Sequence, residues 1–213
     1  METFSHVVQP SIEQLKKNFD FKGKWNKKFF KKHNPIVLEL GCGKGEYSIG
    51  LAEKYPHKNF LGIDIKGARM WVGAKIAQQK NMKNVGFLRI RIDLIEKCFA
   101  KDEIDEIWIT FPDPQIKTRR ARKRLTHPIF LKRYSNFLKK GGFIHLKTDS
   151  QFLYGYTLRI IETENHILQD ATHDLYNEKY QRKHMEIKTY YEDIFLSEGK
   201  VITYLRFVLN LSK

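Results

Sequence analysis

The feature that most constrains the fold is a regular alternation of short apolar runs with longer amphipathic segments, which begins at residue 36. The apolar runs are 36–40, 59–64, 85–92, 106–111, 142–148 and 201–211. The segments between them that have a helical pattern are 45–55, 66–80, 128–139 and 151–164. Strands that alternate with helices of this length are typical of βαβ units, in which helices cover both faces of a mostly parallel sheet.

The C-terminal part of the chain departs from this alternation. The apolar runs 167–172 and 201–211 are expected to form an antiparallel edge of the sheet. The prediction is therefore one α/β domain over residues 36–213. Residues 1–35 are expected to form a separate basic lead-in that ends at Pro35.

The composition is that of a folded protein without membrane or metal signals. The 213 residues are enough for one domain with a substantial core, and 41% of them are hydrophobic. No run approaches the roughly 20 apolar residues of a membrane span, and the N-terminus has no apolar signal-peptide segment. Cys42, Cys98 and the eight histidines show no metal-ligand spacing, and two cysteines make no disulfide framework. A cytoplasmic protein is expected.

The formal net charge of +15 suggests a polyanionic partner, either nucleic acid or a membrane surface. The cations form two clusters. Residues 16–32 carry eight lysines and one acid, Asp20, with five aromatic residues interleaved, and six of the eight residues from Lys117 to Arg124 are Lys or Arg. A solvated, lysine-rich surface is the plainer explanation of such charge.

A glycine-rich loop in "VLELGCGKGEYS" places Gly41, Gly43 and Gly45 between a buried strand and a helix. Glycines allow positive φ angles and let the backbone approach a ligand closely, at the end of the sheet where such folds bind cofactors. Asp64 ends the next strand, 23 positions after Gly41. A carboxylate at that place can accept hydrogen bonds from both hydroxyls of a ribose.

Two cofactors fit this pattern, and S-adenosyl-L-methionine is favoured. A dinucleotide fingerprint needs a third glycine where this chain has Glu46, and an acid at a helix N-terminus disfavours a pyrophosphate. S-adenosyl-L-methionine carries a sulfonium and an ammonium group, for which Glu39 supplies a further carboxylate. Asp93 is placed to meet the adenine amino group, although a helix cap explains it equally well. A tight turn without a ligand is the third reading of the loop.

Later motifs add a specific resemblance. In order, "ELGCGKGEYS", "GIDIK", "FPDP" followed by Lys117 and "KRL", "HLKTD" and "TYYE" resemble the bacterial tRNA (guanine-N7-)-methyltransferases over residues 36–210. The resemblance implies a Rossmann-like class I methyltransferase fold with a mostly parallel seven-stranded sheet, helices on both faces and an antiparallel C-terminal edge strand. It also implies S-adenosyl-L-methionine as methyl donor and N7 of guanine in tRNA as acceptor, usually guanosine 46 of the variable loop.

The same resemblance implies roles for individual residues. The residues expected to bind or surround the cofactor are Glu39, Gly41, Gly43, Asp64, Asp93 and Asp113. Asp113 is also the expected catalytic position. The residues that match substrate-contacting positions are Lys117, Asp149, Thr189 and Glu192. One departure is Gln115, where the family usually has tryptophan after "FPDP".

The chemistry of N7 methylation agrees with a carboxylate at this place. Guanine N7 has a lone pair and no proton, so the reaction needs in-line placement rather than a general base. A fixed carboxylate near the base stabilises the positive charge that develops on it. Asp113 and Asp149 are the candidates for this role, and carboxylates also accept hydrogen bonds from the guanine edge. The alternative for each aspartate is a helix cap or a turn.

The second basic cluster is expected to hold RNA. Turning a base outward costs a few kcal/mol, which phosphate contacts can offset. The candidates for these contacts are Lys117, Arg119, Arg120, Arg122, Lys123 and Arg124, with a solvated loop as the alternative. The N-terminal lysines are either a second RNA contact or part of an amphipathic helix whose aromatic residues pack on the domain. Thr189 and Glu192 also fit an ordinary capping box.

Other functions stay open at this point. They are methylation of another RNA or of a protein, and RNA binding without catalysis on a vestigial fold. The sequence leaves open whether the protein is a monomer or a homodimer.

Overall fold

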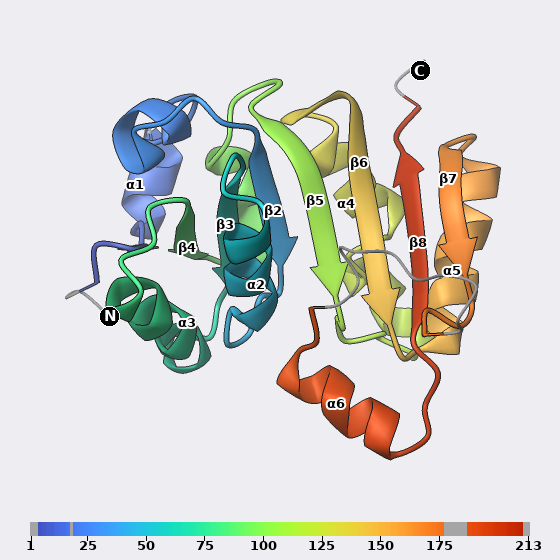
Figure 1. Ribbon diagram of the computed structural model, residues 1–213. Helices are drawn as coiled ribbons and strands as arrows, with labels where there is room; N and C mark the ends of the chain where they lie inside the picture. Colours follow the sequence, from blue (N-terminus) through green and yellow to red (C-terminus); the bar gives the residue numbers. More distant parts are fainter. Residues whose placement is uncertain (1–3, 18, 177–186, 211–213) are drawn as a thin grey trace.

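The computed structural model describes residues 4–17, 19–176 and 187–210. Their strands form an eight-stranded sheet in the order β1-β4-β3-β2-β5-β6-β8-β7 (Figure 1). The strands are β1 (Val7–Val8), β2 (Ile36–Leu40), β3 (Asn59–Asp64), β4 (Val85–Arg89), β5 (Ile104–Thr110), β6 (Leu138–Thr148), β7 (Ile167–Thr172) and β8 (Thr203–Val208). The strands from β1 to β6 pair in parallel, and β8 pairs antiparallel with both β6 and β7.

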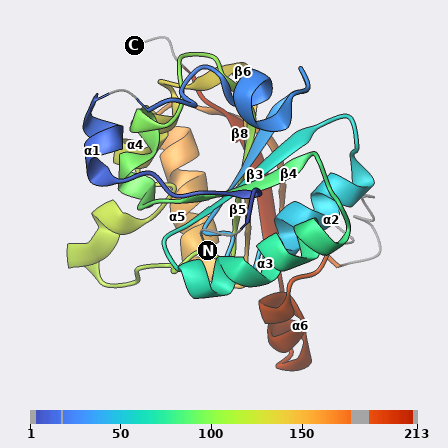
Figure 2. The same ribbon diagram turned by 90° about the vertical axis from the view of Figure 1, so that its left-hand side faces the viewer.

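Helices cover both faces of the sheet. The helices are α1 (Ile12–Lys17), α2 (Glu46–Lys54), α3 (Gly67–Gln79), α4 (Pro128–Tyr134), α5 (Gln151–Thr163) and α6 (Tyr190–Ser197), with the π-helix η1 (Trp25–Phe30) and the 3₁₀-helices η2 (Ile92–Lys97) and η3 (Thr118–Lys123). Figure 2 shows α1, α4 and α5 on one side of the sheet and α2 on the other. Helix α6 lies beyond the end of the sheet at which the parallel strands terminate. Among the described residues, every helix is too short or too polar to cross a membrane.

The predicted α/β fold, with its mostly parallel sheet and antiparallel C-terminal part, is confirmed. Strands β2 and β3 have the predicted bounds, because both faces of each are buried and most of their residues are apolar, with Glu39 within β2 and Asp64 at the end of β3 as the charged exceptions. The edge position belongs to β7, with β8 next to it. The eighth strand, β1, is too short to leave a pattern in the sequence.

The strand predicted over 201–211 is shorter, because β8 spans Thr203–Val208. Two further predicted elements end earlier than expected. The strand predicted over 85–92 ends at Arg89, and the chain enters η2 at Ile92. The helix predicted over 128–139 ends at Tyr134, because Leu138 is already paired with Ile104 in the sheet. Ile90 follows the last residue of β4, and Phe137 lies three residues after the end of α4. Both are buried core residues, so the apolar pattern in the sequence continues past the end of each element.

The basic lead-in packs on the same core. Strand β1 adds to the edge of the sheet beside β4. Phe19, Trp25 and Phe30 are buried in the larger core cluster, and the indole Nε1–H of Trp25 donates to the carbonyl oxygen of Cys98 at 3.0 Å. The sequence predicted either a second RNA contact or aromatic residues packed on the domain, and the structure shows this packing.

Candidate cofactor and RNA site

The glycine loop has the conformation that its sequence predicts. Gly41, Gly43 and Gly45 have φ angles of 78°, 54° and 76°, and the amide of Gly45 closes the turn by donating to the carbonyl of Cys42 at 2.7 Å. A Cβ added to Gly45 would lie 2.5 Å from the ring of Phe87. A Cβ on Gly41 or Gly43 would meet no heavy atom of the described residues within 4 Å. Packing therefore requires Gly45, whereas Gly41 and Gly43 border open space that a ligand can fill.

Asp64 joins this loop to the start of helix α3. Its Oδ2 accepts from the amide of Gly43 at 3.0 Å, and its Oδ1 accepts from the amide of Lys66 at 2.8 Å. The side chain is half-buried at the end of β3. Two backbone donors thus hold the carboxylate in one orientation beside the open space above the loop.

Glu39 lies beneath the loop rather than at its surface. Its buried carboxylate accepts from the amide of Ser48 at 2.9 Å and from the hydroxyl of Thr110 at 2.7 Å. Burial raises its pKa from 4.5 to about 7. The contacts of Glu39 join β2, the first turn of α2 and the end of β5, so Glu39 supports the glycine loop from beneath.

This raised pKa gives a testable pH dependence. Because the folded state favours the protonated Glu39, the protein is most stable relative to a Glu39→Gln variant below pH 4.5. The advantage is lost as the pH rises to about 7, and the change corresponds to about 3 kcal/mol in the free energy of unfolding. Urea unfolding of both proteins at pH 4 to 8, without cofactor, measures it. A difference between the two proteins that does not vary with pH would contradict the prediction.

A cavity of about 500 Å³ opens beside Asp64. It is lined by Asp64, Ile65, Ile90, Arg91, Ile92, Asp93, Arg122, Lys123, Ile129, Phe130 and Arg133. The hydrogen-bonded ion pair with Arg91, at 2.8 and 3.1 Å, lowers the pKa of Asp93. The cavity therefore combines carboxylates, isoleucine side chains between them, and cations of the second basic cluster at its rim.

Asp113 lies in an exposed loop that leaves the end of β5. Its Oδ1 accepts from the amide of Gln115 at 3.0 Å, which forms a small turn. Phe111 and Gln115, on either side, have positive φ angles of 46° and 48°. Such angles are unfavourable for these residue types and persist only where surrounding contacts impose them. Figure 1 shows the end of β5 at the same end of the sheet as that of β2.

Arg124 provides such contacts at Gln115. Its guanidinium donates to the carbonyl oxygens of Pro114, Gln115 and Ile116 at 3.0 to 3.3 Å. It also lies over the rings of Phe152 and Tyr156 of α5, at 4.7 and 4.3 Å from their centroids. With 5% of its surface exposed, Arg124 is not placed where a phosphate could reach it. The structure thus separates it from the other predicted phosphate contacts and makes it a support of the Asp113 loop.

The remaining cations of the cluster are exposed. They are Lys117, Arg119, Arg120, Arg122 and Lys123, on and just before η3. Arg122 and Lys123 reach the rim of the cavity that contains Asp64 and Asp93. The chain therefore brings the predicted RNA contacts directly beside the predicted cofactor residues.

The remaining predicted substrate residues differ in accessibility. Asp149 is half-buried, with its Oδ2 3.8 Å from the ammonium of Lys200. Thr189 and Glu192 form the capping box of α6, and Glu192 is fully buried in an ion pair with Lys147 at 2.7 Å. The structure does not present the Glu192 carboxylate to a ligand, because it is already held by the cap and by the ammonium.

Comparisons with known proteins identify the family of this chain. A family of putative methyltransferases matches residues 33–205. The chain is 56% identical to a tRNA (guanine-N(7)-)-methyltransferase of Christiangramia forsetii over 98% of its own length and 94% of the relative. It is 49% identical to the Porphyromonas gingivalis protein of the same name, over 99% and 87%. This chain belongs to the bacterial tRNA (guanine-N(7)-)-methyltransferase family.

Solved structures that resemble this tRNA (guanine-N(7)-)-methyltransferase family member are more distant in sequence. The 16S rRNA methyltransferase KamB superimposes with a TM-score of 0.65 at 13% identity and covers 86% of this chain and 92% of its own. An antibiotic-related methyltransferase gives 0.63 at 16% identity, over 97% and 98%. At such identities the likeness concerns the fold, which is that of class I methyltransferases.

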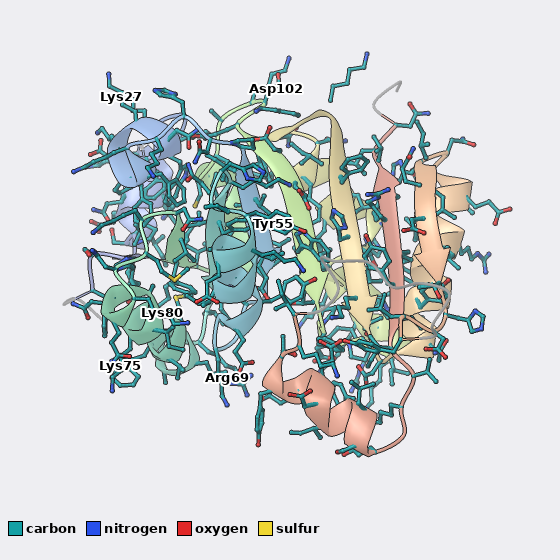
Figure 3. The ribbon with its side chains drawn as sticks, viewed as in Figure 1. Lys27, Tyr55, Arg69, Lys75, Lys80 and Asp102 are labelled. Carbon is teal, nitrogen blue, oxygen red and sulfur yellow. The ribbon has the colours of Figure 1, made fainter. Side chains whose placement is uncertain are left out.

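The sequence analysis did not single out several residues of this family member that the structure places beside the glycine loop. Tyr190 and Tyr191, between the two capping residues of α6, are 52% and 39% exposed. The amide of Tyr190 donates to Glu46 at 2.9 Å, and the ammonium of Lys44 lies 4.0 Å from the ring centroid of Tyr190. Arg69, which Figure 3 shows at the same end of the molecule as α6, lies over Tyr191 at 5.8 Å. Helix α6 is therefore attached to the glycine loop, and the "TYYE" motif alone does not reveal which of its residues face outward.

Proposed function

We propose that this protein transfers the methyl group of S-adenosyl-L-methionine to N7 of guanine in tRNA, at guanosine 46 of the variable loop. The observation that carries the proposal is that Asp64 and Asp93 line the same cavity as Arg122 and Lys123. The carboxylates and apolar side chains of this cavity suit a nucleoside, and its cations suit a nucleic-acid backbone. The names of the relatives, at 49 to 56% identity over nearly the whole chain, support the same substrate and target atom.

The residues around the glycine loop fit the cofactor. Gly41 and Gly43 leave open space where other residues would place a Cβ, so the backbone can approach the methionine part closely. Each Asp64 oxygen has a lone pair beyond the one used by a backbone amide, and these accept from the ribose hydroxyls. Asp93 would meet the adenine amino group, and Ile65 and Ile92, which line the same cavity, would provide apolar contacts. The bound cofactor supplies an electrophilic methyl group.

Asp113 and Asp149 act on the base. Asp113 is held on an exposed turn at the end of β5, and Asp149 follows the end of the neighbouring strand β6. Guanine N7 needs no deprotonation, so these carboxylates orient the base through its N–H groups and stabilise the positive charge that methylation creates. Their placement after adjacent parallel strands allows both to approach one nucleotide from the same side.

The exposed cations of η3 and Lys117 hold the phosphates around that nucleotide. Such contacts position an RNA without reading its sequence, and they make affinity strongly dependent on salt. Tyr190 and Tyr191, exposed beside the glycine loop, offer flat surfaces on which an unstacked base can rest.

The proposal is tested by incubating the protein with methyl-labelled S-adenosyl-L-methionine and unmodified tRNA, followed by digestion to nucleosides. Label in 7-methylguanosine is expected, and it should be absent from a tRNA in which guanosine 46 is replaced by adenosine. Label in another nucleoside would assign a different RNA reaction. Absence of transfer despite saturable cofactor binding, with a tRNA pool that another enzyme methylates, would refute the tRNA activity.

The role assigned to Arg124 is tested by comparison with Arg120. Arg124→Met releases the Asp113 loop, so kcat is expected to fall about 10- to 100-fold through misplacement of the carboxylate. The dependence of tRNA affinity on salt should stay that of the wild type. Arg120→Met, which removes an exposed cation of the same cluster, should instead lower the slope of log affinity against log salt by about 1. Equal salt slopes in the two variants would contradict the distinction.

A further inference from the structure

The N-terminal basic segment forms a surface that the proposed reaction does not use. Its eight lysines, all exposed, are Lys16, Lys17, Lys22, Lys24, Lys27, Lys28, Lys31 and Lys32. Lys28 pairs with Asp20 at 3.2 Å, and Lys22 donates to the carbonyl of Glu96. The other six have no carboxylate partner among the described residues. We refer to these eight side chains as the lysine surface.

The fold holds this surface in place. The aromatic side chains between the lysines point inward, where Phe21 stacks on Trp25 with ring centroids 5.1 Å apart. The Glu103 carboxylate accepts from the amides of Gly23 and Trp25 at 2.8 and 3.2 Å. Because one side of the segment is buried and its backbone is hydrogen-bonded, the lysines are displayed on a rigid support. A polyanion that binds there does not have to order a flexible tail.

The part of the lysine surface that precedes β2, from Lys27 to Lys32, lies at the opposite end of the sheet from the glycine loop, whereas Lys22 reaches Glu96 of η2. The basic segment leads directly into the first residue of β2, whereas the glycine loop follows its last residue. The strand between them is five residues long, which separates the two ends by roughly 17 Å. Figure 3 shows Lys27 at one end of the molecule and Arg69 at the other.

We propose that the lysine surface binds the phosphate backbone of a second region of the same tRNA, away from the methylated guanosine. The inference rests on the proposed function for the identity of the RNA. A single nucleotide is too small to contact both ends of the sheet at once, whereas a folded RNA is large enough to do so. An anionic membrane is the less suitable partner, because interfacial binding inserts apolar side chains and the aromatic residues of this segment face the core. Lysines without carboxylate partners, held on a rigid support, match a phosphate backbone.

The test compares two triple variants of equal charge. The first is Lys24→Gln, Lys27→Gln and Lys32→Gln on the lysine surface. The second is Lys75→Gln, Lys80→Gln and Lys83→Gln, which removes exposed lysines on α3 and just after it. Both lower the net charge of +15 by three. The dissociation constant for unmodified tRNA is measured by titration at several salt concentrations without cofactor.

The first variant is expected to bind tRNA about tenfold more weakly, with a salt slope reduced by about two to three. The second should keep the affinity and slope of the wild type. Equal losses in both variants would overturn the inference, because they would reflect overall charge alone. So would full retention of tRNA affinity in the first variant with loss of binding to phosphatidylserine vesicles, which would assign the surface to a membrane. Since binding is read without methyl transfer, failure of the proposed activity is detected separately.

Discussion

Asp113→Asn is expected to lower kcat for methyl transfer to tRNA by about 10²- to 10³-fold, while tRNA affinity stays close to that of the wild type. Asparagine keeps the side-chain oxygen that accepts from the amide of Gln115, so the turn is preserved. Only the negative charge is removed. The charge stabilises the guanine as it becomes cationic, whereas the affinity for tRNA comes mainly from cations.

The measurement combines steady-state kinetics with a binding titration of the same tRNA. Asp102→Asn is the matched control, because Asp102 is an exposed aspartate at the opposite end of the molecule (Figure 3). It removes the same charge, and asparagine tolerates its positive φ of 56°. This control should keep the kcat of the wild type. A loss of binding that matches the loss of kcat would show that Asp113 acts chiefly by holding the RNA.

Lys147→Met is expected to lower the free energy of unfolding by about 3–5 kcal/mol. Lys147 and Glu192 are both fully buried, and the ammonium lies 2.7 Å from Oε1 and 2.9 Å from Oε2. Burial lowers the pKa of Lys147, so the ammonium depends on this partner. Methionine fills similar space but leaves the Glu192 carboxylate buried without its counter-ion.

The double variant Lys147→Met with Glu192→Gln should recover most of the stability, since no isolated charge stays buried and glutamine can still cap Thr189. Urea unfolding measures both. The control is Lys80→Met, which breaks the exposed ion pair with Glu53 and should cost less than about 1 kcal/mol. A Lys147→Met effect as small as this control, or a double variant no more stable than the single one, would contradict the assigned role.

This ion pair also links two parts of the candidate site. Glu192 is part of the cap of α6, and the first residue of α6 contacts Glu46 and Lys44 of the glycine loop. Lys147 lies on β6, two positions before Asp149. The buried pair thus connects Asp149, a substrate-binding candidate, to the glycine loop through α6.

The sequence alone determined the architecture and the place of the glycine loop and Asp64 within it. Buried parallel strands such as β2 and β3 are mostly apolar, so their bounds follow from local composition. Gly41 and Gly43 lie at the end of one strand and Asp64 at the end of the next. Parallel strands place such ends at one edge of the sheet, so their proximity follows from topology. The motifs also identified the family, because their order is specific.

Only the tertiary structure decided which members of each motif are accessible. Arg124 and Arg122 are both arginines of one basic run, yet Arg124 is buried by rings of α5 that lie about 30 positions further along the chain. Glu192 is buried by Lys147, 45 positions before it, and the tyrosines between the capping residues are exposed instead. Burial depends on contacts between segments distant in the sequence. The local sequence pattern gives no information about those contacts. Residue types therefore predicted the chemistry of the candidate site but not which of its side chains are accessible to a ligand.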